Sequence, residues 1–336
     1  EMGANVFGYA LKPKTSSMFN IVQLASQIAD HYGDIRNFCE IHKFIKSVQP
    51  EVLFHLAAQP LVTESYLDPI KTIETNVLGS SNLLMAASGV ESVKAIVNIT
   101  TDKCYENKEW CWAYRENDRL GGSDPYSASK AACEIAISSW RESFCGSKFN
   151  QNCYLSIASA RSGNIVGGGD WAEDRIIPDA IRALQSRKLI QIRNPGATRP
   201  WQHVLEPLSG YLLLAEKLYQ SKLEKYSSRN IYESSFNFGP PLKSNQTVMS
   251  LIKRIMKYWP GEWEINSENY YHESARLHLN IDKAYHNLNW SSKWSFEYTI
   301  KRTIEWYKRV FDGLTDAKTA TMDDIIEYEK NLTNIN

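Results

Sequence analysis

Short apolar segments alternate with helical patterns over the first half of the chain. Segments 51–58 and 93–100 are almost continuously apolar, whereas residues 40–48 place apolar side chains at helical spacing. Strands that are apolar on both faces and that alternate with helices indicate a parallel sheet covered by helices on each side. The pattern therefore predicts an α/β fold, with strands at 5–10, 51–58, 93–100 and 155–159 and helices at 40–48, 70–88 and 126–144.

The second half of the chain is more irregular. A glycine cluster at 167–169 is followed by two predicted helices, at 178–187 and 207–219, with aromatic and Arg/Pro-rich loops between them. The Ser/Lys-rich segment 220–229 is typical of an exposed connection. We therefore expect a smaller, irregular region interleaved with the larger sheet domain.

Charge and composition exclude several classes of protein. The 38 basic residues balance the 38 acidic ones, so no long-range field favours nucleic acid or an anionic membrane. The six cysteines form no C-x-x-C pair and the seven histidines are scattered, so we predict no metal site. No apolar segment approaches about eighteen residues and no signal peptide opens the chain, which predicts a cytoplasmic protein.

The candidate chemistry is a tyrosine and a lysine four residues apart. Tyr126 and Lys130 fall on one face of the predicted helix, one turn apart, and Asp124 with Pro125 can begin that helix. A tyrosine has an ordinary pKa of about 10, which a neighbouring positive charge lowers. Thr101-Asp102-Lys103 follows an apolar strand, and ligands bind at the carboxyl ends of such strands. A hydroxyl, an acid and a base are therefore expected beside Tyr126.

These residues carry a family resemblance. Thr101, Tyr126 and Lys130 match the Ser/Thr-Tyr-Lys triad of the extended short-chain dehydrogenases/reductases. Thr101-Asp102 further resembles the nucleotide-sugar 4,6-dehydratases, in which an acidic pair follows the threonine, although Lys103 replaces the second acid here. The likeness runs from residue 1 to about 312, and it is most specific, toward the members that act on CDP-glucose, in segments 102–107, 124–130, 163–171 and 199–204.

The resemblance implies NAD-dependent dehydration of CDP-glucose to CDP-4-keto-6-deoxyglucose. Carbon 4 is oxidised, water leaves across carbons 5 and 6, and the hydride returns to carbon 6. Tyr126 takes the proton of the 4-hydroxyl, Thr101 hydrogen-bonds that hydroxyl, and Asp102 protonates the departing hydroxyl. Lys103 either removes the proton at carbon 5 in its neutral form or stays charged and stabilises the enolate. The family also implies a homo-oligomer, a dimer or tetramer, that acts in deoxysugar synthesis.

The remaining candidate residues contact ligands. We expect several residues to contact or brace NAD, together with Tyr126 and Lys130. They form an Asp-Ile turn after a short strand, a group of residues after strand 51–58, a helical Asn and a strand-end Thr. They are Asp34, Ile35, Leu56, Ala57, Ala58, Asn76 and Thr100. Arginines that pair with phosphate and tryptophans that stack on rings suit the nucleotide sugar. The substrate candidates are Gln59, Asn164, Trp171, Arg193, Arg199 and Trp201.

The resulting domain division is interleaved. We assign residues 1–162 and about 203–232 to a Rossmann-like NAD-binding domain with a doubly wound parallel sheet. Residues 163–202 and about 233–315 form the smaller α/β substrate-binding domain, and 316–336 form a tail. Tyr9 follows the first predicted strand, where NAD enzymes of this kind often carry an acidic ribose ligand.

One expected motif does not occur. Doubly wound dinucleotide folds carry a glycine-rich turn after their first strand, and this sequence contains none. Because residues 4–9 already resemble a second strand, we expect the first strand and helix, roughly 30 residues, to be missing before Glu1. If the native chain began near Glu1, we would expect weak NAD binding and little activity.

Two alternatives stay open at this point. A sugar-nucleotide 4-epimerase would use the same Tyr/Lys pair, but it would not need an acid and a base after Thr101. A dehydratase that acts on another nucleotide sugar belongs to the same alternative. A non-catalytic nucleotide-binding protein is the second alternative, and the absent glycine-rich turn supports it.

Overall fold

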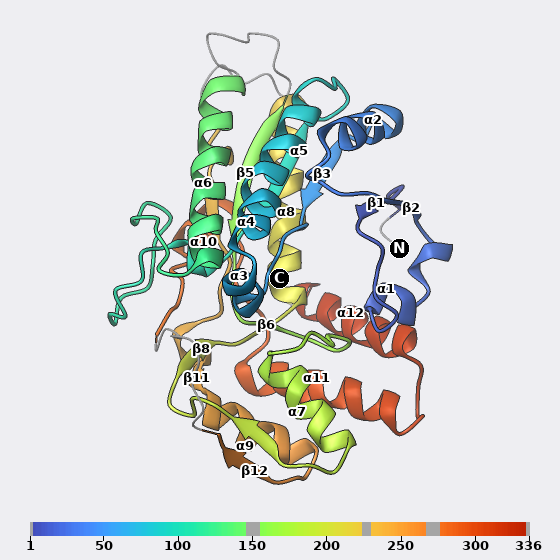
Figure 1. Ribbon diagram of the computed structural model, residues 1–336, viewed down its shortest axis with the longest axis vertical. Coiled ribbons are helices and arrows are strands. Elements are labelled where there is room, and N and C mark those ends of the chain that lie inside the picture. Colours follow the sequence, from blue (N-terminus) through green and yellow to red (C-terminus); the bar gives the residue numbers. More distant parts are fainter. Residues whose placement is uncertain (1–2, 146–154, 224–229, 267–275, 334–336) are drawn as a thin grey trace.

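The computed structural model describes residues 3–145, 155–223, 230–266 and 276–333 (Figure 1). Its larger sheet has the strand order β10-β5-β4-β3, with all neighbours parallel. Val97 at its centre pairs with Phe54 on one side and Ala158 on the other. The four strands are β3 (Val52–His55), β4 (Ala95–Ile99), β5 (Ser156–Arg161) and β10 (Ser235–Asn237).

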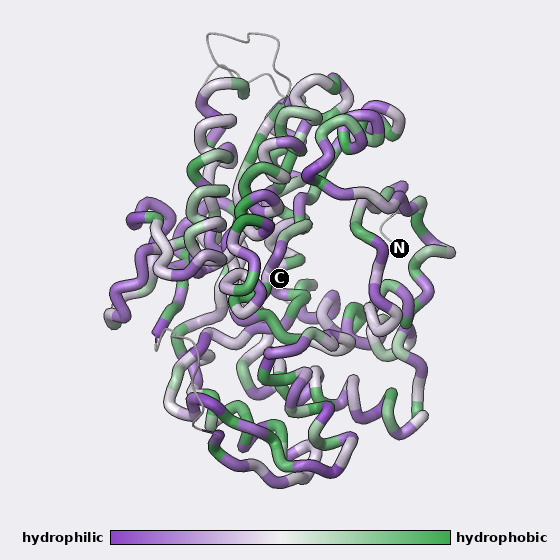
Figure 2. Tube along the Cα trace, viewed as in Figure 1, coloured by the Kyte–Doolittle hydropathy of each residue, from purple (hydrophilic) through white to green (hydrophobic). Residues whose placement is uncertain are grey.

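Helices cover both faces of this sheet, as the sequence pattern predicts. Ile96 and Ile157 point into a core shared with α5 (Ser80–Ser88) and α6 (Pro125–Phe144). Their neighbours Val97 and Ala158 point the other way, into a core with α8 (Leu205–Leu223). Figure 2 shows hydrophobic residues on the helices and strands of this region, and β4 and β5 are buried almost throughout. β4, with Ile96 on one face and Val97 on the other, therefore lies in the middle layer of a three-layer fold.

The two strands nearest the N-terminus form a separate parallel pair. β1 (Phe7–Ala10) pairs with β2 (Ala29–Tyr32), and Figure 1 shows this pair set apart from β3. Within the described residues, neither strand hydrogen-bonds to β3. Side chains on both sides of the interruption are exposed, with Phe7 at 47% and Phe54 at 37%. The prediction of a buried strand over 51–58 is therefore wrong in part, since β3 is shorter and one of its apolar side chains is exposed.

The helix predicted over 70–88 is divided. It begins as α4 (Pro69–Ile73), passes through a π-helical segment over Glu74–Gly79 and continues as α5. A wider π turn places Asn76 inward, where its side chain hydrogen-bonds to Gln59 and Ser129. α2 (Phe38–Val48) packs against α5, and α3 (Val62–Leu67) packs against α4. The short helix α1 (Met18–Ile21) lies between β1 and β2 in the sequence.

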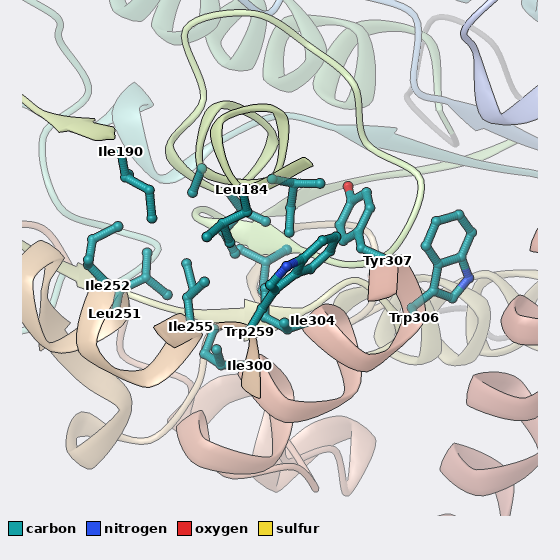
Figure 3. Close-up of a cluster of buried hydrophobic side chains, with 14 of the residues drawn as sticks. Leu184, Ile190, Leu251, Ile252, Ile255, Trp259, Ile300, Ile304, Trp306 and Tyr307 are labelled. Carbon is teal, nitrogen blue, oxygen red and sulfur yellow. The ribbon is translucent and has the colours of Figure 1, made fainter. Parts of the chain in front are cut away.

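A smaller region packs around a second core (Figure 3). Ile181, Ile252 and Ile304 meet there from three helices, α7 (Ile176–Gln185), α9 (Val248–Tyr258) and α11 (Phe296–Phe311). Short strand pairs complete it: β6 (Ile165–Val166) with β9 (Gln202–His203), β7 (Ile190–Ile192) with β12 (Trp263–Ile265), and β8 (Thr198–Pro200) with β11 (Asn245–Thr247).

Two boundaries differ from the sequence-based division. β10 was assigned to the substrate-binding domain, but it pairs with β5 in the larger sheet, and α10 (Asp282–Leu288) packs on the same core. The tail forms α12 (Ala317–Thr333), which packs against α11 and donates a hydrogen bond from Tyr328 to Glu206. α8 extends into the connection predicted over 220–229, of which 224–229 lie outside the described residues. None of the described helices is long and apolar enough to cross a membrane.

Candidate active site

The first component of the site is the turn that follows β4. Thr101 caps a short 3-10 helix over Asp102–Cys104 and accepts a hydrogen bond from the Lys103 amide at 3.3 Å. The Asp102 amide donates to the Ser162 carbonyl at 3.2 Å, which ties the turn to the end of β5. Thr101 and Asp102 are both buried. Adjacent parallel strands thus hold the turn at the carboxyl edge of the sheet.

The second component is the N-terminal half of α6. Asp124 caps this helix by accepting from the Ser127 amide, and Pro125 occupies its first turn, as predicted. Tyr126 and Lys130 are buried one turn apart. The Lys130 ammonium donates to the Ile99 carbonyl at 3.4 Å, so it lies at the end of β4.

The electrostatics show that these two components meet. Burial raises the pKa of Tyr126 to about 12, and a hydrogen bond with Thr101 and the charge of Arg175 oppose this rise. The Asp102 carboxylate acts on the same phenol and favours its protonated form. The structure therefore brings Thr101, Asp102, Tyr126 and Lys130 to one place, although the protein's own groups do not ionise the phenol near neutral pH.

Asp102 is placed to hold a proton. Burial raises its pKa against the opposing charges of Lys103 and Arg199. One carboxyl oxygen, Oδ1, accepts from the Thr101 hydroxyl at 3.1 Å, and Oδ2 has no hydrogen-bond partner within the described residues. A Cβ on Gly163 would lie only 1.9 Å from Oδ2, so glycine is required there. The arrangement suits a carboxylic acid that donates its proton to a ligand.

Lys103 is partly buried beside this acid, and its charge lowers the pKa of Asp102. Both roles that the sequence allows for Lys103, base and enolate stabiliser, stay predictions.

A pocket beyond β2 contains the predicted Asp-Ile turn. It is lined by Asp34, Arg36, Asn37, Glu74, Leu78 and Asn82. The Asp34 carboxylate accepts from the Arg36 amide at 2.9 Å and pairs with the Arg36 guanidinium at 2.7 Å, while Ile35 is buried under Gly79. Tyr9 donates to the Asp34 carbonyl at 3.2 Å, so it braces this turn.

The other predicted cofactor residues differ in exposure and in hydrogen bonding. Leu56 is exposed after β3, and Ala57 and Ala58 are half-buried. Thr100 is buried and donates to Glu134. The Asn76 amide is buried, and its three hydrogen bonds to Gln59 and Ser129 support a bracing role.

The substrate candidates do not all line one site. The Arg199 charge reaches Asp102, and Asn164, with a φ of 50°, accepts from the Gln202 amide. Arg193 is exposed and pairs with Asp174 at 2.7 Å, while Trp171 packs edge-on against Tyr307.

Two of the predicted substrate residues are corrected by their packing. Trp201 is only 4% exposed, belongs to the second core and donates to the Gln246 carbonyl, so it does not present a face for stacking. The Gln59 side chain is buried and hydrogen-bonds to Leu61 and Thr72, which leaves it committed to its own loop.

The sequence reasoning missed two charged residues. Arg175 immediately precedes α7 and its charge opposes the rise in the pKa of Tyr126, yet nothing local in the sequence marks it. Glu134 forms a buried ion pair with Arg161, and its position one helical turn after Lys130 was the available signal.

Several solved structures share this fold. A dTDP-glucose 4,6-dehydratase from Streptomyces venezuelae, with NAD and TYD bound, superposes with a TM-score of 0.71 at 21% identity, covering 86% of this chain and 83% of that one. A UDP-glucose 4-epimerase from Thermotoga maritima gives 0.71 at 18% identity, covering 91% and 99%. The Rossmann-like fold predicted from the sequence is confirmed.

Sequence comparison then defines the family. Residues 3–303 match the family model described as GDP-mannose 4,6 dehydratase. A CDP-glucose 4,6-dehydratase from Salmonella typhimurium is 43% identical over 331 residues, covering 98% of this chain and 90% of that protein. A dTDP-D-glucose 4,6-dehydratase from Bos taurus is 26% identical over 298 residues, covering 86% and 76%. The chain belongs to the nucleotide-sugar 4,6-dehydratases of the extended short-chain dehydrogenase/reductase family.

Proposed function

We propose that this enzyme is a hydro-lyase that converts CDP-glucose to CDP-4-keto-6-deoxyglucose with bound NAD. The observation that carries the proposal is the buried Asp102, which hydrogen-bonds to Thr101 through Oδ1, leaves Oδ2 unpaired within the described residues, and acts on Tyr126; burial raises its pKa. We choose CDP-glucose as the substrate because the chain is 43% identical to the CDP-glucose 4,6-dehydratase from Salmonella typhimurium.

Each catalytic side chain has a role that its surroundings support. Tyr126 accepts the proton of the sugar 4-hydroxyl, and Thr101 orients that hydroxyl through its own. Lys130 places a positive charge at the end of β4, close to this proton transfer. Asp102 donates its proton to the hydroxyl that leaves carbon 6. Because burial raises the pKa of Tyr126 to about 12, the base requires further positive charge when it acts.

The residues present fit NAD at two points. The pocket beside Asp34 and Leu78 offers an acceptor carboxylate and an apolar side chain to the adenosine end. Lys130 and the Ile99 carbonyl lie at the carboxyl edge of the larger sheet, where dinucleotides bind in such folds. NAD, when bound, supplies the hydride acceptor for carbon 4 and a positive charge.

The epimerase alternative has one observation in its favour, since the Thermotoga epimerase shares the fold as closely as the dehydratase does. An epimerase expels no hydroxyl and has no use for a proton-holding acid after Thr101. The buried Asp102 therefore favours elimination.

Exposed apolar side chains and the cysteines support a proposal for assembly and compartment. Exposed apolar side chains on α4, α5 and α6, among them Ile70, Met85 and Ile135, support a homo-oligomer formed through these helices. Cys39, Cys104, Cys111 and Cys133 carry free thiols, which suits the reducing cytoplasm.

The direct test is the mass of the product formed from CDP-glucose in the presence of NAD. We expect a product lighter by one water that absorbs in alkali, and none from Tyr126→Phe. CDP-galactose, which has the mass of the substrate, would establish the epimerase instead. Complete absence of turnover by the full-length protein would contradict the proposal.

A further inference from the structure

A buried ion pair lies directly beneath the catalytic turn. Arg161, the last residue of β5, places Nη2 2.7 Å from Oε2 of Glu134 on α6, and both side chains are at most 3% exposed. Two charges taken out of water cost more than their attraction returns in many proteins, so such a pair is weak evidence for stability alone. The role of the pair is therefore indicated by the groups that it hydrogen-bonds to.

The Glu134 carboxylate holds the end of β4. Its Oε1 accepts from the Thr100 hydroxyl at 2.5 Å, and its Oε2 also accepts from the Ser159 hydroxyl of β5 at 2.8 Å. Thr100 is the residue immediately before Thr101 and Asp102. One carboxylate thus fixes both strands that support the catalytic turn.

The Arg161 guanidinium holds the other end of the same turn. Its Nη1 donates to the Tyr105 hydroxyl at 2.7 Å and to the Glu116 carbonyl at 3.0 Å. Tyr105 in turn donates to Asn237 on β10 at 2.7 Å. Thr100 and Tyr105 flank residues 101–104, so the ion pair is hydrogen-bonded to the residues on both sides of the turn.

We propose that Glu134 and Arg161 are positioning residues for the dehydration assigned above, an inference that rests on the proposed function. Glu134 lies one helical turn after Lys130, on the helix that also carries Tyr126. The base, its lysine and the anchor of the catalytic turn therefore move as one body. Reaction rates are sensitive to misplacement of about 1 Å, so loosening this anchor slows chemistry more than binding.

Lys130 is also affected by this carboxylate. Burial lowers the pKa of Lys130, and the charge of Glu134 opposes that effect. The contribution is in the direction that keeps the ammonium charged beside Ile99.

The chain contains a matched control for this site. Glu233 is a buried carboxylate that accepts from a β5 serine, Ser156, at 2.7 Å and pairs with a cation, Lys222, at 3.0 Å. Ser156 begins β5, whereas Ser159 lies near its catalytic end. Glu233→Gln therefore repeats the chemical change of Glu134→Gln away from the turn.

The test compares kcat and KM of the full-length variants with CDP-glucose and NAD. We expect Glu134→Gln to lower kcat about 10- to 100-fold with KM within about threefold. Glu233→Gln should lower the melting temperature about as much as Glu134→Gln does, and it should leave kcat within about threefold of the parent value. A folded Glu134→Gln that keeps kcat within threefold, or equal losses in both variants, would overturn the positioning role.

Thr100→Val covers the case in which Glu134→Gln does not fold, because it removes only the donor hydroxyl and leaves the ion pair intact. It should lower kcat about 3- to 10-fold, and Thr100→Ser should restore it. Parent-like kcat in Thr100→Val would contradict the proposal.

Amide hydrogen exchange separates this inference from the proposed function. In Thr100→Val or Glu134→Gln the amides of Thr100 and Asp102, which donate to Ala160 and Ser162, should exchange at least tenfold faster. Those of β4 near Ala95 should not change. If the full-length parent protein makes no product from CDP-glucose, the proposed function fails, and this exchange pattern still decides whether the pair holds the turn.

Discussion

The larger sheet and the β1–β2 pair are both parallel, yet they differ in how their residues are buried. β4 and β5 are buried almost throughout, between α6 on one face and α8 on the other. β2 is exposed throughout and β1 is only partly buried. Tyr9 and α2 provide the packing that joins this pair to the core between the larger sheet and helices α5 and α6.

The difference has a functional meaning. Thr101 follows β4, and Tyr126 and Lys130 lie on α6, in the part of the molecule where the sheet is packed on both faces. The protein's own side chains therefore hold the geometry of the site. Asp34 stands beside the exposed pair, where fewer apolar contacts oppose local opening. We expect chemistry to be preorganised and nucleotide binding to be the more adjustable property.

Substitutions that change stability should give the largest difference between the larger sheet and the β1–β2 pair. Ile157 is fully buried on β5, so Ile157→Ala removes apolar contacts and leaves a cavity, and should cost about 3 kcal/mol of unfolding free energy. Phe7, about half exposed on β1, should cost below about 1 kcal/mol when changed to Ala. Urea unfolding measures both values, and equal losses would contradict the comparison.

A smaller effect is expected where the catalytic turn meets β5. Gly163→Ala places a methyl group on the Asp102 carboxyl, so kcat should fall about 10- to 100-fold as the acid is displaced. Gly89→Ala is the matched control because a Cβ there meets nothing within 4 Å. Steady-state kinetics with CDP-glucose give the result. An unchanged kcat in Gly163→Ala would show that Asp102 is not held as described.

The smallest effect concerns the exposed pair. Asp34→Ala removes the carboxylate of the pocket beyond β2 and should weaken NAD binding about 5- to 10-fold, the value of one modest hydrogen bond. Asp30→Ala, on exposed β2 outside that pocket, should leave the affinity unchanged. Titration calorimetry measures both, and equal affinities for the two variants would remove Asp34 from the cofactor site.

Local sequence signals predicted local structure well. Asp124 and Pro125 mark the start of α6 by themselves, and the spacing of Tyr126 and Lys130 needs only a helix. The π segment over Glu74–Gly79 was missed because long-range hydrogen bonds of Asn76 accompany it. Hydropathy alone continues smoothly through that region.

Long-range pairing explains the other errors. β10 has three residues, and its place in the larger sheet depends on pairing with a strand far away in the sequence. The burial of Trp201 and the Glu134–Arg161 ion pair likewise depend on partners that no local pattern names. Features within single elements were therefore predicted better than features that depend on packing between elements.

The central claim is that one site oxidises carbon 4 and then expels water with the help of Asp102. The most direct measurement follows deuterium placed on carbon 4 of CDP-glucose. The account predicts that the deuterium appears on carbon 6 of a dehydrated product, and that Tyr126→Phe forms that product at least about a thousandfold more slowly. Deuterium that stays on carbon 4 of an undehydrated sugar would contradict it.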